Sequence, residues 1–169
     1  MQQAELGALY DAHFRRVYNY ISYRLNDHSQ VDDLVSTVFL RVIDRYAQYD
    51  PRKGPVEGWI IGIARNAITD HYRERAKLQA VDIEEVANLL PDGETPEVIC
   101  VRNEDHLRLI GALSTLAPRE RDVIALKYGA ELGHRQIARQ LNLSLSNVGV
   151  ILFRSLRKLR TELGKEVSS

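Results

Sequence analysis

The sequence predicts an all-α protein of two small helical domains joined by an acidic linker. Apolar residues recur every three or four positions through most of the 169 residues, which is the period of an amphipathic helix. No stretch shows the alternation of apolar and polar residues that marks a half-exposed strand. Residues 79–103 carry six acidic side chains and one basic one, and they include Pro91, Gly93 and Pro96, which interrupt helices. We therefore expect domains at residues 1–78 and 104–169.

Three helices are expected in the first domain. The first two are antiparallel neighbours, and the segment YDPRKG, residues 49–54, separates the second from the third. The apolar positions of the first are Leu6, Leu9, Tyr10, Phe14, Val17, Tyr18, Ile21 and Leu25. Those of the second are Val31, Leu34, Val35, Val38, Phe39, Val42, Ile43 and Tyr46. Those of the third are Trp59, Ile60, Ile63, Ala64, Ala67, Ile68 and Tyr72.

Four helices are expected in the second domain. Leu107, Ile110 and Leu113 mark the first. Pro118 suits the first turn of the second helix, because its fixed φ is helical and its missing N–H is not needed there, and Gly129 ends that helix. The last two helices span residues 134–141 and 145–163.

These last two helices have the spacing of a helix-turn-helix motif. Ser144 is a suitable N-cap for the final helix. Ala138 is small where the two helices would cross, Asn142 can adopt the left-handed turn conformation, and Val148 is apolar where the final helix packs back. Such a motif places its second helix in a DNA groove. Helical hairpins without a DNA partner can show the same pattern.

Composition excludes several classes of protein. The net charge is zero, with 23 basic and 23 acidic residues, which argues against coating DNA by charge alone. A single cysteine, Cys100, rules out an internal disulfide framework, and no signal peptide or membrane span is evident, so we expect a cytoplasmic protein. The five histidines are scattered, and His71 with Glu74 is one isolated pair. No catalytic site, metal site or cofactor is expected.

Three segments together resemble a known family. They are DDLVSTVFLRVIDRY, GWIIGIARNAITDHYRER and LAPRERDVIALKY, and the C-terminal helix pair follows them. In order and spacing they look like bacterial RNA polymerase sigma factors of the extracytoplasmic-function (ECF) group of the sigma-70 family, over residues 5–77 and 104–162. The resemblance implies a region-two-like domain (1–78), an acidic linker (79–103) and a region-four-like domain (104–169).

The resemblance also implies a function. Such a protein binds core RNA polymerase, through the beta-prime coiled coil and the beta flap, and directs initiation at promoters by recognising minus-ten and minus-thirty-five DNA elements. In related factors the linker enters the polymerase cleft or the RNA exit path. Regulation by an anti-sigma factor is common in the group.

For polymerase binding, the resemblance points to the second helix. The residues it implies are Asp32, Asp33, Leu34, Phe39 and Arg41. A helix buries one stripe in its own domain, so a core role is the alternative for each apolar residue here. Where the family commonly has a Gln-Glu pair, this chain has Ser36 and Thr37.

For the minus-ten element, the resemblance points to the third helix and the loop before it. The residues are Arg52, Lys53, Trp59, Arg65, Asn66, Tyr72 and Arg73. Aromatic and basic side chains together suit a surface that holds unstacked bases and follows phosphates. The loop Tyr49–Pro55 resembles the part that captures a flipped base. Trp59 also fits the apolar period, so a core role is its alternative.

For the minus-thirty-five element, the helix-turn-helix pair supplies Arg135, Ser146, Asn147, Val150, Arg154 and Arg157. A helical wheel places Leu145, Val148, Leu152, Leu156, Leu159 and Leu163 on the core side. The family often has Lys or Arg where this chain has Gly149 and Ile151. We therefore expect Ser146 and Asn147 to contact base edges, Val150 a thymine methyl, and the two later arginines phosphates. Alternatively, Val150 is merely exposed and Ile151 extends the core.

Two further interpretations remain open at this stage. The first is a stand-alone helix-turn-helix regulator whose N-terminal half senses a ligand or dimerises, which would bind palindromic sites. The second is a relative of sigma factors that binds polymerase without directing initiation.

Overall fold

The computed structural model describes residues 3–81 and 104–167, and within these ranges it contains helices and no strand. The N-terminal helices are α1 (Gln3–Arg24), α2 (Val31–Arg45) and α3 (Val56–Val81). The C-terminal helices are α5 (Glu104–Ser114), α6 (Pro118–Ile124), α7 (His134–Leu141) and α8 (Leu145–Val167). The predicted all-α class is confirmed. Most of the predicted linker lies outside the described residues, and α3 continues three residues past the expected boundary at residue 78.

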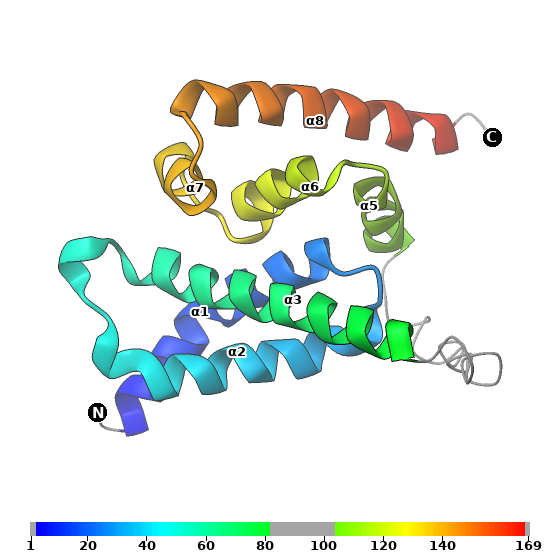
Figure 1. The fold of residues 1–169 in the computed structure, drawn as a ribbon. Coiled ribbons are helices and arrows are strands. Elements are labelled where there is room, and N and C mark those ends of the chain that lie inside the picture. The colour runs from blue at the N-terminus through cyan, green and yellow to red at the C-terminus, as the bar shows by residue number, and fades with distance from the viewer. Residues whose placement is uncertain (1–2, 82–103, 168–169) are drawn as a thin grey trace.

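The N-terminal domain is a bundle of α1, α2 and α3. Figure 1 shows α2 and α3 side by side, joined by the loop that precedes α3. Val17, Val38 and Ala64 are fully buried, one from each helix, so the three apolar stripes meet in one core. Asp27 begins a short 3₁₀ turn after α1 by accepting a hydrogen bond from the Ser29 amide at 3.0 Å.

In the C-terminal domain, local signals set the helix boundaries as predicted. Pro118 occupies the first turn of α6, which continues as a π-helical turn that ends at Gly129. Asn142 adopts the left-handed conformation with φ 53°, and the Ser144 hydroxyl accepts a hydrogen bond from the Asn147 amide at 3.1 Å. Val148 is fully buried where α8 packs against α7.

The core stripe of α8 is narrower than the helical wheel predicted. Val148, Leu152 and Leu159 are buried, but Leu145 is 49% exposed and Leu156 41% exposed. The prediction was wrong for these two leucines. At about 100° per residue they lie at the edge of the stripe, while Ser155 lies at its centre and is fully buried. The buried Ser155 hydroxyl has a hydrogen-bond partner within the helix, because it donates to the Ile151 carbonyl at 2.6 Å.

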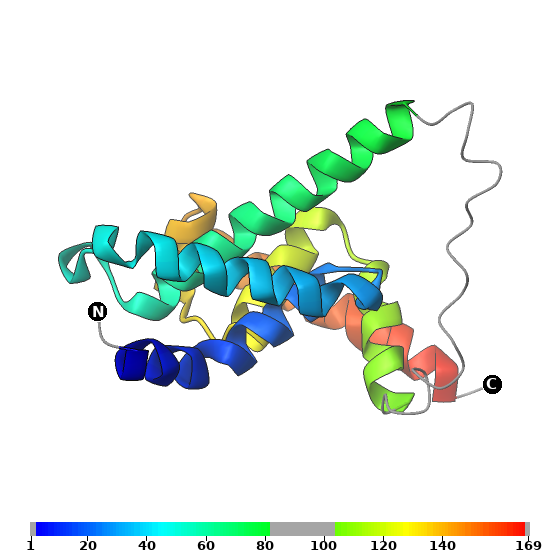
Figure 2. The same cartoon turned by 90° about the horizontal axis from the view of Figure 1, so that it is seen from below.

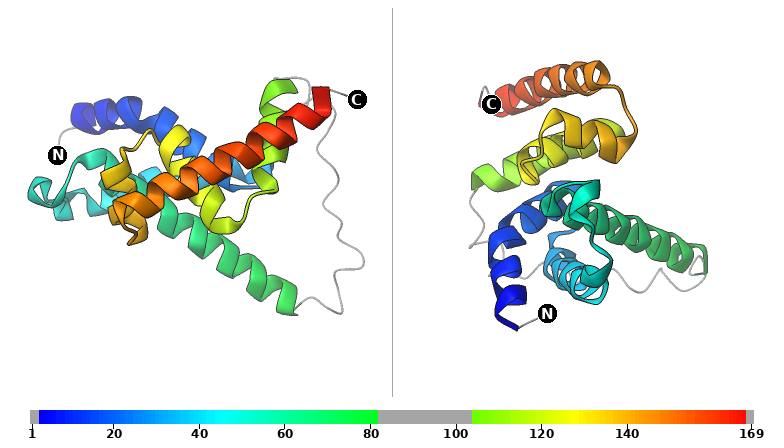
Figure 3. Two further views of the ribbon diagram at one scale, coloured as in Figure 1. Left: turned by 90° about the horizontal axis from the view of Figure 1, so that it is seen from above. Right: turned by 90° about the vertical axis from the view of Figure 1, so that its left-hand side faces the viewer.

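The two domains pack against each other. Figures 1 and 3 show the C-terminal helices as a layer over α1 and α3, with α8 outermost. Seen from below, in Figure 2, α1, α2 and α3 lie in front of that layer. The π-helical turn Ala125–Gly129 rests on α1. None of the described helices is both long and apolar enough to cross a membrane.

Candidate nucleic-acid and polymerase interfaces

The loop between α2 and α3 is an ordered platform of aromatic rings. Tyr46, Tyr49 and Trp59 are mutual neighbours, with ring centroids 5.3 to 6.2 Å apart. The Tyr49 hydroxyl donates to the Gly54 carbonyl at 3.0 Å, and Gly54 has φ 148°, which favours glycine. The half-buried Trp59 therefore supports the loop while it keeps part of its surface accessible.

The two basic residues of this loop differ in whether they are paired with an acidic side chain. Arg52 is 89% exposed, and its guanidinium donates two hydrogen bonds to Asp50, at 2.9 Å each. These bonds from Arg52 hold the pKa of the Asp50 carboxyl below its ordinary value. Lys53 is exposed, and no ion pair to it is found among the described residues. Lys53 is thus the cation of this loop that is available to a phosphate.

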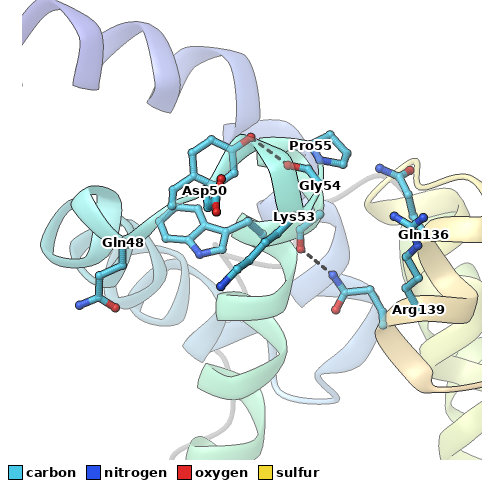
Figure 4. Close-up of a pocket in the computed structure, with 11 residues that line it drawn as sticks. Gln48, Asp50, Lys53, Gly54, Pro55, Gln136 and Arg139 are labelled. Carbon is cyan, nitrogen blue, oxygen red and sulfur yellow. Dashed lines mark hydrogen bonds between the residues drawn. The ribbon is translucent and has the colours of Figure 1, made fainter.

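A pocket of about 330 Å³ lies beside the platform, with walls from both domains. Gly54, Pro55, Lys53 and the aromatic rings form one side. As Figure 4 shows, Gln136 and Arg139 of α7 approach from the other side. The predicted base-capturing loop therefore faces the helix-turn-helix domain directly in this structure.

The predicted minus-ten residues on α3 fall into two stripes. Trp59, Asn66 and Arg73 are spaced by seven residues and share one side, where Asn66 and Arg73 are exposed. Arg65 and Tyr72 lie about 100° away around the helix. The Tyr72 hydroxyl donates to the Arg24 carbonyl at 3.0 Å, so this ring covers the end of α1. The structure does not bring all predicted residues onto one open surface.

Arg65 is engaged by the C-terminal domain. Its guanidinium donates to the Gln140 carbonyl at 2.7 Å and lies 3.6 Å from the Asp122 carboxylate. Asp122 also accepts a hydrogen bond from the buried Tyr20 hydroxyl at 2.8 Å. Burial is the main cause that raises the pKa of Tyr20 well above its ordinary value, and the negative charge of Asp122 raises it further. The phenol therefore stays protonated.

On α2, the predicted polymerase residues divide between surface and core. Asp32 and Asp33 are exposed. Leu34 and Phe39 are only 8% and 6% exposed and belong to the core of the bundle. The prediction that they contact the polymerase directly is therefore corrected, because a side chain buried in its own domain has little surface left for a partner. Leu40 and Ile43 are instead 63% and 45% exposed.

Arg41 is half-buried and paired within the domain. Its guanidinium donates to the Asp70 carboxylate of α3 at 2.8 Å. Together with Asp33, Thr37 and His71, this pair lines a polar pocket of about 310 Å³ between α2 and α3. Arg41 therefore joins the two helices, and reversing its charge would place two carboxylates side by side.

All six predicted minus-thirty-five residues lie on the surface. Arg135 is exposed on α7, and the remaining five are exposed on α8. α8 forms the outer layer of the molecule, on the side away from the N-terminal domain, so this face is open (Figure 1). Ile151 is half-buried, in line with the alternative that it extends the core edge.

One exposed aromatic residue on α8 was missed by the sequence reasoning. Phe153 is 64% exposed, and the Arg157 guanidinium lies 6.0 Å from its ring centroid. It is three residues after Val150, so both lie toward the outer side of the helix. Its position on the wheel, away from the apolar stripe, was the available signal.

An apolar groove of about 540 Å³ crosses the C-terminal domain. Its lining is apolar apart from Arg160 and comprises Tyr23, Leu109, Leu113, Ile124, Tyr128, Leu156, Leu159, Arg160 and Leu163. Leu156, the residue expected in the core, lines this groove instead. The helical wheel could not predict the groove, because it forms where α5, α6, the π-helical turn and α8 meet Tyr23 of α1.

Comparison with known proteins identifies both domains. Residues 9–78 match the family model of sigma-70 region 2, and residues 112–161 match that of sigma-70 region 4. These are the two domains that carry the surfaces described above, in the order that the sequence predicted.

Several proteins with similar sequences are named ECF RNA polymerase sigma factors. The chain is 26% identical to the ECF RNA polymerase sigma factor BldN of Streptomyces coelicolor, over 90% of this chain and 58% of that protein. It is 26% identical to SigX of Bacillus subtilis (92% and 81% covered) and 24% identical to SigM of the same organism (96% and 98% covered). The chain thus spans little more than half of BldN but nearly all of SigM.

Solved structures show the same fold. RpoE in complex with the anti-sigma factor NepR from Bartonella quintana superposes with a TM-score of 0.75 at 14% identity, covering 95% of this chain and 97% of that one. CnrH in complex with the cytosolic domain of CnrY gives 0.70 at 21% identity, covering 97% and 90%. With both family models matched in order, the chain belongs to the sigma-70 family of RNA polymerase sigma factors, in its extracytoplasmic-function group.

Proposed function

This sigma factor binds core RNA polymerase and directs promoter-specific transcription initiation, and we propose that its two domains perform different parts of this function. The N-terminal domain, residues 1–78, binds the polymerase and the minus-ten element. The C-terminal domain, residues 104–169, recognises the minus-thirty-five element. One observation supports this division. The C-terminal domain exposes the polar face of α8, and the N-terminal domain carries the aromatic and basic loop before α3.

The polymerase contact is assigned to the exposed side of α2. Asp32 and Asp33 supply negative charge, and Leu40 and Ile43 supply apolar area at the other end of the helix. Apolar area flanked by charge is typical of protein interfaces. We assign the beta-prime coiled coil to this surface. Leu34 and Phe39 act indirectly, because they hold α2 on its domain.

A second polymerase contact is assigned to the apolar groove of the C-terminal domain. Its apolar lining, with Leu156 and Tyr128 41% and 48% exposed, suits an amphipathic helix or an apolar loop tip. We assign the beta flap to this groove. An anti-sigma factor that covers either polymerase surface would prevent holoenzyme formation. The structurally similar sigma factor RpoE forms a complex with the anti-sigma factor NepR.

For the minus-ten element, the loop and one stripe of α3 form the contact surface. An unstacked base would rest on the Tyr49 and Trp59 rings, while Lys53, Asn66 and Arg73 contact the strand. Arg65 joins this surface once the C-terminal domain releases it. The acidic linker, by its charge, suits a channel built for nucleic acid.

For the minus-thirty-five element, the N-terminal part of α8 enters the major groove. Ser146 and Asn147 contact base edges, Val150 lies against a thymine methyl, and Arg135, Arg154 and Arg157 contact phosphates. None of this requires covalent chemistry, so we propose that the protein is not an enzyme and acts in the cytoplasm with the polymerase.

Transcription by reconstituted holoenzyme tests the proposal. The purified chain is mixed with core polymerase and a library of promoter fragments, and transcripts are sequenced. We expect initiation downstream of paired elements that core polymerase alone ignores. Tight binding of the isolated chain, as a dimer, to palindromic DNA without transcription would instead favour a stand-alone regulator.

A further inference from the structure

The pocket between the aromatic platform and α7 has the size of a small-ligand site. Its volume is about 330 Å³, and protein pockets that hold small molecules have volumes of about 300 to 1,000 Å³. The Gln140 side chain donates to the Gly58 carbonyl at 2.6 Å, and because both residues line the pocket, this bond ties its two walls together. Tyr49 and Trp59 lie on one wall with ring centroids 5.3 Å apart. A planar ring can therefore stack on this wall.

The charged residues of the lining favour an anion. They are Asp50, Lys53 and Arg139. The Asp50 carboxylate accepts two hydrogen bonds from the Arg52 guanidinium, at 2.9 Å each, so its charge is already offset. Lys53 and Arg139 are exposed, and among the described residues no ion pair to either is found. Figure 4 shows Lys53 on the loop and Arg139 on the facing wall, so two cations from opposite sides are available to a phosphate.

Hydrogen-bond donors on the lining complete such a site. The Gln136 side-chain oxygen accepts from the Gly133 amide at 2.9 Å, which fixes this side chain at the start of α7. Within residues 3–81 and 104–167, no bond from the Gln136 NH₂ group or from the Trp59 indole N–H is found. Both groups can donate to the oxygen and nitrogen acceptors of a nucleobase. Stacking rings, side-chain donors and cations together are the groups that hold a base and its phosphate.

We propose that this pocket is a binding site for a free nucleoside phosphate. The base stacks on the Tyr49 or Trp59 ring and accepts a hydrogen bond from Gln136. The phosphate lies against Lys53 and Arg139. The proposed promoter contacts use neither Gln136 nor Arg139, so the site goes beyond promoter recognition. One consequence rests on the proposed function: a nucleotide on these rings excludes the unstacked minus-ten base that is assigned to them.

The fluorescence of Trp59 tests the proposal, because it is the only tryptophan of the chain. The free full-length chain is titrated with adenosine, guanosine, cytidine and uridine monophosphates and with the corresponding nucleosides. Emission is excited at the red edge of the indole band, where nucleotides absorb little. We expect saturable quenching by a nucleotide, with an affinity about tenfold higher than that of its nucleoside, because the phosphate adds charge-assisted hydrogen bonds.

Arg139→Gln is the test variant, and Arg135→Gln is the matched control. Both arginines are exposed on α7, but only Arg139 lines the pocket. Arg139→Gln should weaken nucleotide binding by about tenfold and leave nucleoside binding unchanged, because it removes a phosphate contact. Arg139→Lys should restore most of the affinity, and Arg135→Gln should bind nucleotides as the wild type does. Circular dichroism verifies that each variant is folded.

A single-stranded minus-ten oligonucleotide distinguishes a free nucleotide from promoter DNA as the source of the base. Arg139→Gln should lose affinity for the mononucleotide and keep the wild-type affinity for the oligonucleotide, and its holoenzyme should transcribe as the wild type does. Quenching by the oligonucleotide alone, or equal losses of affinity for the two ligands, would assign the pocket to promoter DNA and overturn the inference.

Three further outcomes would also overturn it. They are the absence of saturable quenching by any nucleotide, nucleosides that bind as tightly as their nucleotides, and equal losses from the two arginine-to-glutamine variants. A wild-type chain that directs no transcription with core polymerase would refute the proposed function instead. Nucleotide binding is measured without polymerase, so the two failures are distinguishable.

Discussion

Asn147 and Arg154 lie two turns apart on the exposed side of α8, and their side chains suit different parts of DNA. The Asn147 amide can donate and accept at an adenine edge, whereas the Arg154 guanidinium suits a phosphate. Asn147→Ala should cost about 1–3 kcal/mol at a single base pair of the minus-thirty-five element. Arg154→Ala should weaken all promoters alike and reduce the slope of log affinity against log salt by about one. Holoenzyme binding to promoter variants measures both.

Lys165→Ala is the control for charge loss on the same helix. Lys165 pairs with Glu162 and lies eleven residues beyond Arg154, about 16 Å along α8. It should leave affinity unchanged. A base-specific loss from Arg154→Ala with a uniform loss from Asn147→Ala would contradict the assignment.

Glu120 couples stability to pH. It accepts from the Lys158 ammonium at 2.7 Å and from the Ala117 amide at 3.1 Å, and the bond from Lys158 is the main cause that lowers the pKa of Glu120 below its ordinary 4.5. A lowered pKa stabilises the fold above 4.5, and this contribution disappears as pH falls through the folded-state pKa. Glu120→Gln should therefore cost less than about 1 kcal/mol at pH 7, and nothing in acid.

Urea unfolding of wild type and variant between neutral and acidic pH measures this difference. Glu162→Gln, in the exposed pair with Lys165 near the end of α8, is the matched control and should change little at any pH. A Glu120→Gln penalty that grows as pH falls would show that the sign is wrong.

Among the elements, α2 carries its proposed polymerase-contacting side chains and its core side chains on different sides. Leu40 and Ile43 are exposed, so changing both to Ala should weaken core polymerase binding and leave the free energy of unfolding nearly unchanged. Phe39→Ala should lower the free energy of unfolding by about 3–5 kcal/mol, because it empties part of the core. Titration with labelled core polymerase and chemical denaturation distinguish the two. Undiminished polymerase affinity in the double variant would place the interface elsewhere.

The helices and their caps could be predicted because their signals are local. The left-handed Asn142, the Ser144 cap and Pro118 at the start of α6 each act on neighbouring backbone. The contacts of Arg121 could not be predicted in this way. A charged residue near a helix N-terminus resembles a solvated one, and its partners are about 100 residues earlier in the chain.

For the same reason, the candidate sites were predicted unevenly. The exposed side of α8 follows from helical period alone, so its polar residues were placed correctly on the surface. Helical period placed Phe39 in the apolar stripe of α2 and left Leu40 out, as the structure has them. It also placed Ile43 in that stripe, yet Ile43 is 45% exposed, because which residues at the edge of the stripe are covered depends on where α1 and α3 pack. Arg65 was predicted on the helix where it lies, but its contact with Gln140 depends on how the domains dock.

At the scale of the whole molecule, charge balance limits what the free protein can bind. With 23 basic and 23 acidic residues, the chain repels phosphate about as much as it attracts it, so few counterions are released on binding. We expect weak binding of duplex promoter DNA by the free protein and strong binding by the holoenzyme. Fluorescence anisotropy at low and moderate salt measures both. Tight, sequence-specific duplex binding by the isolated monomer would contradict this.

The bonds from Arg121 to the end of α1 also have a consequence for biosynthesis. The last carbonyls of a helix lack partners within it, and here Tyr23 and Leu25 receive theirs from a residue 98 and 96 positions later. At about 5–20 residues per second, a ribosome needs roughly 5–20 s to make that stretch. The first helix therefore leaves the ribosome with a water-capped end and acquires its protein partner only after nearly a hundred further residues have been made. The nascent N-terminal domain thus passes through a stage in which its proposed polymerase and minus-ten surfaces are uncovered.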